Sequence, residues 1–185
     1  MSFDPDQVYQ PEADTFLLLE AARAELKPDD QVLEIGTGSG YIASELFRSV
    51  KIIATDINPH AVASARKTGV EVIRTDLFSG ICGTFDLVIF NPPYLPTLLE
   101  ERLDDWLEYA LDGGETGRIV IERFARGVTE VLAPSGRILL LVSSLTGLEA
   151  VRDLFSHQGF STVVVKQQQV EDETLFVIKI IRVID

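Results

Sequence analysis

Short apolar runs alternate along the chain with longer stretches whose apolar residues recur at helical spacing. The short runs predict buried strands at 31–35, 51–55, 71–74, 85–90, 137–142, 161–168 and 174–182. The longer stretches predict helices at 14–26, 41–48, 118–132 and 148–157. A further helix is expected to begin at about Pro59, with Asn58 as its N-cap.

The order of these elements predicts the fold class. Strands that alternate with helices imply right-handed crossovers and a parallel sheet with helices on both faces. Only residues 169–173 separate the last two predicted strands, which must therefore pair as an antiparallel hairpin. We expect an α/β protein with a seven-stranded, mostly parallel sheet and a C-terminal antiparallel hairpin. Ligands bind beyond the carboxyl ends of the strands in such sheets, so the residues there are the candidates for a site.

Composition narrows the class of protein. The 185 residues, 46% of them hydrophobic, suit one domain with its own core, expected to span residues 1–185. No apolar run approaches the roughly 20 residues of a membrane span, and the N-terminus has no signal-peptide pattern, so a soluble, cytoplasmic protein is expected. Cys82, His60 and His157 are too few for a cysteine and histidine zinc site. No metal is expected, and both histidines are predicted on helix surfaces.

The net charge of the chain indicates whether nucleic acid or protein is the expected binding partner. With 29 acidic and 16 basic residues the net charge is −13, and no local basic patch offsets it, so direct nucleic acid binding is not expected. The densest acidic run lies within residues 100–108. It is interpreted either as a solvated helical face or as a landing surface for a basic protein. Trp106 within this run either anchors the segment on the core or contacts a substrate.

A glycine-rich loop follows the first predicted strand. Gly36, Gly38 and Gly40 permit a tight turn and bring bare backbone close to a ligand at the N-terminus of the next helix. Such loops occur with several nucleotide cofactors, and also as plain strand-to-helix turns. The glycines alone therefore do not identify the ligand.

Three acidic residues near the same strand ends indicate which cofactor the loop binds. Asp56 lies 20 residues beyond Gly36, the spacing at which a carboxylate reaches a ribose diol, although an Asp here also suits a turn or helix cap. Acidic side chains suit a cofactor with a sulfonium and an ammonium better than one with a pyrophosphate. S-adenosylmethionine is therefore favoured over a dinucleotide. Glu34 is expected at its methionine end, and Asp76 with the backbone N–H of Leu77 at its adenine edge.

The fourth predicted strand ends in Asn91-Pro92-Pro93-Tyr94, the most specific feature of the sequence. Each proline restricts the residue before it and lacks an N–H, so a rigid loop with free carbonyl acceptors is predicted, although a plain strand-ending turn is the alternative. An amide or arylamine nitrogen is a poor nucleophile until its two hydrogens are held out of plane. The Asn91 side-chain oxygen and the Pro92 carbonyl are predicted to accept those hydrogens, while Tyr94 stacks on the flat substrate group. This chemistry predicts a methyltransferase.

The chain resembles the HemK-like protein glutamine methyltransferases, in particular their short archaeal and eukaryotic branch. The resemblance covers nearly the whole chain and is carried by residues 8–18, 33–40, 55–59, 75–77, 90–94, 113–118 and 173–175. Asn-Pro-Pro-Tyr alone is shared with DNA and RNA amino-methyltransferases. The opening Tyr-x-Pro-x-x-Asp-Thr-Phe-Leu-Leu is more particular, although Ala13 departs from the acidic residue usual before Asp14 and Thr15.

The resemblance implies a class I, Rossmann-like methyltransferase fold and N5-methylation of the glutamine in the Gly-Gly-Gln motif of a class I translation release factor. It implies that the cofactor is contacted by Thr15, Glu34, Gly36, Gly38, Asp56, Asp76, Leu77 and Asn91. It implies that the glutamine is held by Asn91, Pro92, Pro93 and Tyr94. Adenine N6-methylation of DNA or RNA, lysine methylation of a protein and a catalytically silent binding module are the alternatives.

The resemblance also implies a partner for the sheet. Members of this branch often work with a small zinc-binding activator subunit that pairs with the edge of the sheet. The third strand, between Glu71 and Arg74, is the expected edge, and unpaired edges invite strand addition. A bare edge solvated through its charged residues is the alternative.

Overall fold

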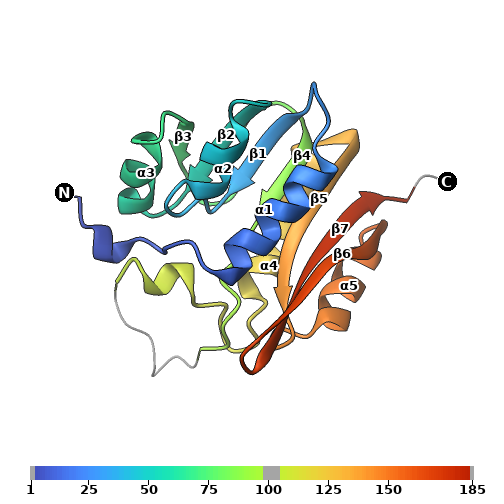
Figure 1. The fold of residues 1–185 in the computed structure, drawn as a ribbon. Coiled ribbons are helices and arrows are strands. Elements are labelled where there is room, and N and C mark those ends of the chain that lie inside the picture. Colours follow the sequence, from blue (N-terminus) through green and yellow to red (C-terminus); the bar gives the residue numbers. More distant parts are fainter. Residues whose placement is uncertain (1–2, 98–104, 184–185) are drawn as a thin grey trace.

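The strands form one sheet in the computed structural model, which describes residues 3–97 and 105–183. Their order across the sheet is β3-β2-β1-β4-β5-β7-β6 (Figure 1). In chain order the strands are β1 (Gln31–Ile35), β2 (Lys51–Asp56), β3 (Glu71–Arg74), β4 (Phe85–Phe90), β5 (Leu132–Ser143), β6 (Phe160–Val170) and β7 (Glu173–Arg182).

The pairing confirms the predicted mixture of strand directions. Strand β1 pairs in parallel with both β2 and β4, and β4 pairs in parallel with β5. Strand β7 runs antiparallel to its neighbours β5 and β6, and β6 and β7 form the predicted hairpin. The strand order reverses beside β1, since β2 and β3 lie on one side of it and β4 and β5 on the other. Open α/β sheets bind ligands at this reversal.

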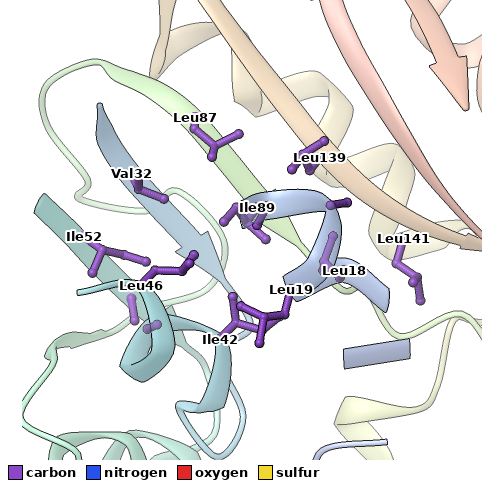
Figure 2. Packing of buried hydrophobic residues seen from close by; sticks show 14 of the residues in the cluster. Leu18, Leu19, Val32, Ile42, Leu46, Ile52, Leu87, Ile89, Leu139 and Leu141 are labelled. Atoms are coloured by element: carbon purple, nitrogen blue, oxygen red, sulfur yellow. The ribbon is translucent and has the colours of Figure 1, made fainter. Parts of the chain in front are cut away.

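Helices cover both faces of the sheet. They are α1 (Ala13–Glu25), α2 (Tyr41–Leu46), α3 (Pro59–Arg66), α4 (Ile119–Gly127) and α5 (Leu148–Ser156). Side chains of α1, α2 and α3 pack on one face, whereas those of α4 and α5 pack on the other. Figure 2 shows the first of these layers, with Leu18 and Leu19 of α1 and Ile42 and Leu46 of α2 over the strands.

Alternate side chains of β4 point to opposite faces of the sheet and so fix the position of the loop that follows the strand. Leu87 and Ile89 belong to the core beneath α1, whereas Val88 and Phe90 belong to the core beneath α4. The ring of Phe90 packs on that of Phe124, with 4.8 Å between centroids. Because a slip of one residue would exchange the two faces, this packing sets the position at which β4 ends.

The helix predicted at 118–132 is too long. Helix α4 ends at Gly127, a short 3-10 turn spans Val128–Glu130, and β5 already begins at Leu132. A Cβ atom on Gly127 would lie 2.8 Å from the ring of Phe78, so a glycine is needed at this helix end. The β-branched Val128, Thr129 and Val131 that follow have low helix propensity, and Pro134 excludes a continued α-helix.

The surface position predicted for His60 is wrong. Its side chain is buried, with 6% of its surface exposed, and its Nδ1 accepts the N–H of Asp4 at 2.9 Å. The N-terminal 3-10 element Pro5–Gln7 covers α3, where Asn58 Nδ2 donates to the Gln7 carbonyl at 2.7 Å. His157 is exposed just after α5. None of the helices in the two described ranges has the length and apolar character of a membrane crossing.

Candidate active site

A cavity of about 1200 Å³ lies at the carboxyl ends of β1, β2, β3 and β4. The N-terminal segment and the segment around residues 106–112 also line it, and Figure 1 shows both beyond these strand ends. Every site residue predicted from the sequence lines this cavity: Thr15, Glu34, Gly36, Gly38, Asp56, Asp76, Leu77, Asn91, Pro92, Pro93 and Tyr94. The structure therefore brings together residues spread over 80 positions of the chain.

The loop after β1 forms one wall of the cavity. Gly36 and Gly38 have φ values of +65° and +55°, a region that side chains other than glycine rarely adopt. The N–H of Gly38 donates to Asp56 Oδ2 at 2.8 Å, and the N–H of Thr37 donates to the Thr55 carbonyl at 2.9 Å. These bonds hold the loop against the end of β2. Gly40 is not part of this wall, since a Cβ atom there would lie 2.7 Å from Ala65 on α3.

Two buried carboxyl groups stand behind the loop. Burial raises the pKa of Glu34 from its ordinary value of 4.5 to about 8, against the hydrogen bonds from Thr37 and the Ala43 N–H that lower it. Thr37 Oγ1 donates to Glu34 Oε2 at 2.7 Å. Burial also raises the pKa of Asp56, although backbone N–H groups oppose this shift. A bound cation would favour the ionised form of either carboxyl group.

Asp76 has a partner that the sequence did not predict. Arg123 Nη2 on α4 donates to Asp76 Oδ2 at 2.7 Å, and both side chains are about half exposed at the cavity. Leu77, the next residue, has a φ of +48°, and its N–H makes no backbone hydrogen bond among the described residues. The adjacent residues Asp76 and Leu77 thus offer one acceptor and one donor at the cavity, and their contact with an adenine edge stays a prediction.

The loop after β4 presents an unused acceptor. Asn91 Nδ2 donates to Asp14 Oδ2 at 2.9 Å, whereas Asn91 Oδ1 is buried without a hydrogen-bond partner among the described residues. Pro92 is buried beside it, and no hydrogen bond among the described residues uses its carbonyl. Tyr94 lines the cavity, and burial together with the negative charge of Asp14 raises its pKa, so the phenol stays neutral. A buried orphan acceptor is costly unless a ligand donates to it.

Asp14 is a site residue that the sequence reasoning missed. It is almost fully buried on the first turn of α1, 77 positions before Asn91. Helical spacing places it on the same face as Leu17, Leu18 and Ala21, which all pack in the core. A carboxylate on an apolar helix face is therefore the signal that would have identified it. No comparable signal marks Arg123.

Trp106 is fixed by the N-terminal segment and by the edge of the sheet. Its backbone N–H donates to Gln7 Oε1 at 2.8 Å, and the guanidinium of Arg74 lies 5.7 Å from the centre of its ring. Its side chain also lines the cavity. Most of the predicted acidic run, including residues 100–104, lies outside the described residues.

The charge of the cavity fits a cationic ligand. Among the described residues that line it, one is basic, Arg123, and nine are acidic. The acidic residues are Asp6, Glu12, Asp14, Glu34, Asp56, Asp76, Glu108, Asp112 and Glu173. Such a lining attracts a sulfonium and an ammonium and disfavours a pyrophosphate.

The fold and this cavity together define a class I, S-adenosylmethionine-dependent methyltransferase. The family model of the methyltransferase small domain matches residues 10–102. Methyltransferase HEMK2 of Homo sapiens is 35% identical, over 93% of this chain and 88% of its own. A provisionally named protein N5-glutamine methyltransferase of Methanocaldococcus jannaschii is 37% identical, over 93% of this chain and 90% of its own. The chain belongs to the HemK-like protein glutamine methyltransferases.

A solved structure supports the same family. The Mtq2 chain in the E. cuniculi Mtq2-Trm112 complex is 31% identical and superposes with a TM-score of 0.81. The match covers 96% of this chain and 99% of that chain. That complex is described as responsible for methylation of the eRF1 translation termination factor.

Proposed function

We propose that the protein transfers the methyl group of S-adenosylmethionine to the side-chain nitrogen of the glutamine in the Gly-Gly-Gln motif of a translation release factor. The observation that carries this proposal is that, among the described residues, neither the buried Asn91 Oδ1 nor the carbonyl of the adjacent Pro92 has a hydrogen-bond donor. Two acceptors on adjacent residues fit a nitrogen that carries two hydrogens, as a glutamine amide does. The eRF1 substrate of the related Mtq2 complex supports the choice of a release factor.

The residues around the cavity divide between cofactor and substrate. Glu34 and the loop of Gly36 and Gly38 are assigned to the methionine end of the cofactor, Asp56 to its ribose, and Asp76 and Leu77 to its adenine. Thr15 and Asn91 complete these contacts. When bound, S-adenosylmethionine supplies an electrophilic methyl group on a positively charged sulfur.

The chain's own contribution is to orient the substrate nitrogen. The lone pair of an amide nitrogen is delocalised, so hydrogen bonds to Asn91 Oδ1 and the Pro92 carbonyl draw its two hydrogens out of plane and aim the lone pair. Tyr94 is assigned to stack on the flat amide. No general base is needed before transfer, because the nitrogen becomes acidic once it is alkylated and its proton leaves to water.

The same geometry weighs against the alternative substrates. A lysine ammonium has no free lone pair and requires a base first, whereas burial raises the pKa of both Tyr9 and Tyr94, which keeps these phenols protonated. An adenine amino group suits the loop equally well. However, the phosphates of DNA or RNA would meet a cavity with nine acidic residues and one basic residue among its described lining.

Methyl transfer from labelled S-adenosylmethionine to a release factor tests the proposal. We expect label on the release factor, no label on its Gln→Ala variant and none on DNA. Asn91→Ala should lower transfer by about 10²–10³-fold and leave cofactor affinity within about threefold. Gln168→Ala, which removes an exposed amide on β6, is the matched control and should transfer normally. Label on DNA alone, or equal labelling of the Gln→Ala variant, would overturn the assignment.

The free edge of β3 is assigned to a small zinc-binding activator subunit. In the part of the chain that the structure describes, β3 pairs with β2 alone. Ile73 on β3 is 37% exposed, and Ile57, just after β2, is 36% exposed. An added strand would pair with the unused backbone groups of β3 and cover these apolar side chains. The Trm112 subunit of the related Mtq2 complex supports a partner of this kind.

Co-purification with a Trm112-type subunit tests whether the edge of β3 binds the activator. Ile73→Lys should reduce the amount of subunit recovered at least tenfold, because a charge would replace a covered apolar side chain. Val163→Lys is the matched control, since Val163 is 50% exposed on β6, the opposite edge of the sheet. If the β6 variant lost the complex and the β3 variant kept it, the partner would bind at β6 and the proposed β3 interface would be wrong.

A further inference from the structure

Asp14 carries a buried negative charge at the centre of a small hydrogen-bond network. Its Oδ2 accepts both the hydroxyl of Tyr9 and the Nδ2 of Asn91, each at 2.9 Å. Its Oδ1 accepts the backbone N–H of Thr15 and, at 3.0 Å, the hydroxyl of the same residue. With 3% of its surface exposed, this carboxylate has exchanged water for these four donors.

A role in capping α1 does not explain the burial of this charge. Glu12 and Thr15 already form a capping box at the start of the helix. Two of the four donors to Asp14, Tyr9 and Asn91, lie outside α1, and they meet at the cavity. The carboxylate therefore connects the N-terminal segment to the loop after β4.

The geometry points to Asp14 as the positioning residue that holds the Asn91 carboxamide with its oxygen facing the substrate nitrogen. The amide has two orientations, related by a half turn that exchanges Nδ2 and Oδ1. The turned amide would place its oxygen against the Asp14 carboxylate, where two acceptors would face each other at about 2.9 Å. Asp14 therefore excludes that orientation and leaves Oδ1, which is buried without a hydrogen-bond partner among the described residues, as the acceptor for the substrate nitrogen.

The charge of Asp14 also acts through the amide. A carboxylate bonded to the NH₂ group polarises the carboxamide and strengthens its oxygen as an acceptor. During transfer the nitrogen lone pair forms the new bond to carbon, the carbon–sulfur bond breaks with its electrons on sulfur, and the nitrogen is positive until its proton leaves to water. A fixed negative charge behind Asn91 favours that developing positive charge. This inference rests on the proposed function for the identity of the substrate.

The orientation of Asn91 is measurable without substrate or cofactor. The chain has two asparagines, Asn58 and Asn91, so protein labelled with ¹⁵N-asparagine gives two side-chain NH₂ signals. We expect the Asn91 NH₂ protons to exchange slowly with solvent, and Asp14→Ala to accelerate their exchange at least tenfold. The Asn58 signal, whose NH₂ donates to Gln7, should not change. Fast exchange at Asn91 in the unaltered protein would overturn the contact.

Kinetics separate positioning from a structural role. Asp14→Asn, which keeps the shape of the side chain, should lower kcat by about 10–100-fold and leave the affinity for S-adenosylmethionine within about threefold. Because Asp14 acts through Asn91, adding Asp14→Asn to Asn91→Ala should cause no further loss. Glu20→Gln, an exposed substitution on the same helix, is the control and should leave kcat unchanged.

The outcomes distinguish this inference from the proposed function. Multiplicative losses in the double variant, or a loss of cofactor affinity as large as the loss of kcat, would show that Asp14 supports the fold and not the amide. A release factor that stays unlabelled with the unaltered protein would contradict the proposed function alone. The exchange of the Asn91 signal would still decide whether Asp14 holds the amide.

Discussion

The N–H of Gly38, in the loop after β1, donates a 2.8 Å hydrogen bond to the carboxylate of Asp56 at the end of β2. The other oxygen of Asp56 accepts the N–H of Asn58 at 2.9 Å. One carboxylate thus holds two loops in place while it faces the cavity. Each of its oxygens retains acceptor capacity for a ligand hydroxyl, so building the loops and binding the cofactor are compatible.

Replacing Asp56 with Ala tests both the loop contacts of this carboxylate and its proposed contact with the cofactor. The N–H groups of Gly38 and Asn58 would lose their acceptor, which should lower the free energy of unfolding by about 1–3 kcal/mol. The affinity for S-adenosylmethionine, measured by calorimetry, should fall at least about tenfold. Asp153→Ala, on an exposed position of α5, should change neither quantity. Unchanged cofactor affinity in the Asp56 variant would limit this residue to a structural role.

Much of this site was predictable because its signals are local. Short stretches of sequence predict the order of strands and helices, the final hairpin and the loop after β4. Parallel strands then bring their carboxyl ends to one edge of the sheet. The residues at those ends, from Glu34 to Tyr94, could therefore be placed together before any contact was known.

The contacts that orient the site were not predictable in this way. Asp14 bonds to Asn91 across 77 positions, and Arg123 bonds to Asp76 across 47. No local sequence pattern links the two residues of either pair, because each contact depends on how two distant elements pack. The burial of His60 has the same cause, because it follows from the N-terminal segment folding over α3.

The raised pKa of Glu34 predicts a specific dependence of stability on pH. The folded protein holds a proton on Glu34 up to about pH 8, whereas the unfolded chain loses it near 4.5. The folded state therefore binds more protons between these values, and the free energy of unfolding should fall as pH rises, by at most about 1.4 kcal/mol per unit. Below about pH 4.5 and above about pH 8 this contribution should be flat.

Urea unfolding from pH 5 to pH 9 measures this dependence. Glu34→Gln cannot ionise, so its stability should decline less steeply with pH than that of the unaltered protein. Glu130→Gln, at an exposed position before β5, should keep the original slope. Identical slopes for the unaltered protein and Glu34→Gln would show that Glu34 is ionised throughout.

Gly40 belongs to the glycine-rich loop by sequence but packs against a helix. A Cβ atom there would lie 2.7 Å from both Cα and Cβ of Ala65, whereas one on Gly69 would meet nothing within 4 Å. The two glycines have nearly the same φ, +85° and +89°, so Gly69→Ala isolates the backbone cost, about 1 kcal/mol. Gly40→Ala should cost a further 1–3 kcal/mol or so from overpacking. Equal losses in urea unfolding would refute the close packing.

Arg137 and Asp30 form a buried ion pair at the end of the sheet opposite the cavity. Arg137 Nη1 donates to Asp30 Oδ1 at 3.1 Å and to the Asp86 carbonyl at 3.0 Å, and both side chains are almost fully buried. Removing one partner leaves the other charge buried without a counter-charge. This lowers the free energy of unfolding much more than the loss of a surface ion pair does.

Arg137→Met should therefore lower the free energy of unfolding by about 3–5 kcal/mol, because Asp30 would stay buried without its cation. Adding Asp30→Asn should recover part of this loss, since no unpaired charge then remains. The rate of methyl transfer per folded molecule should stay unchanged in both variants, because neither residue lines the cavity. Arg152→Met, which breaks an exposed pair with Glu149, should cost less than about 1 kcal/mol. A double variant less stable than Arg137→Met alone would show that the loss comes from packing and not from the buried charge.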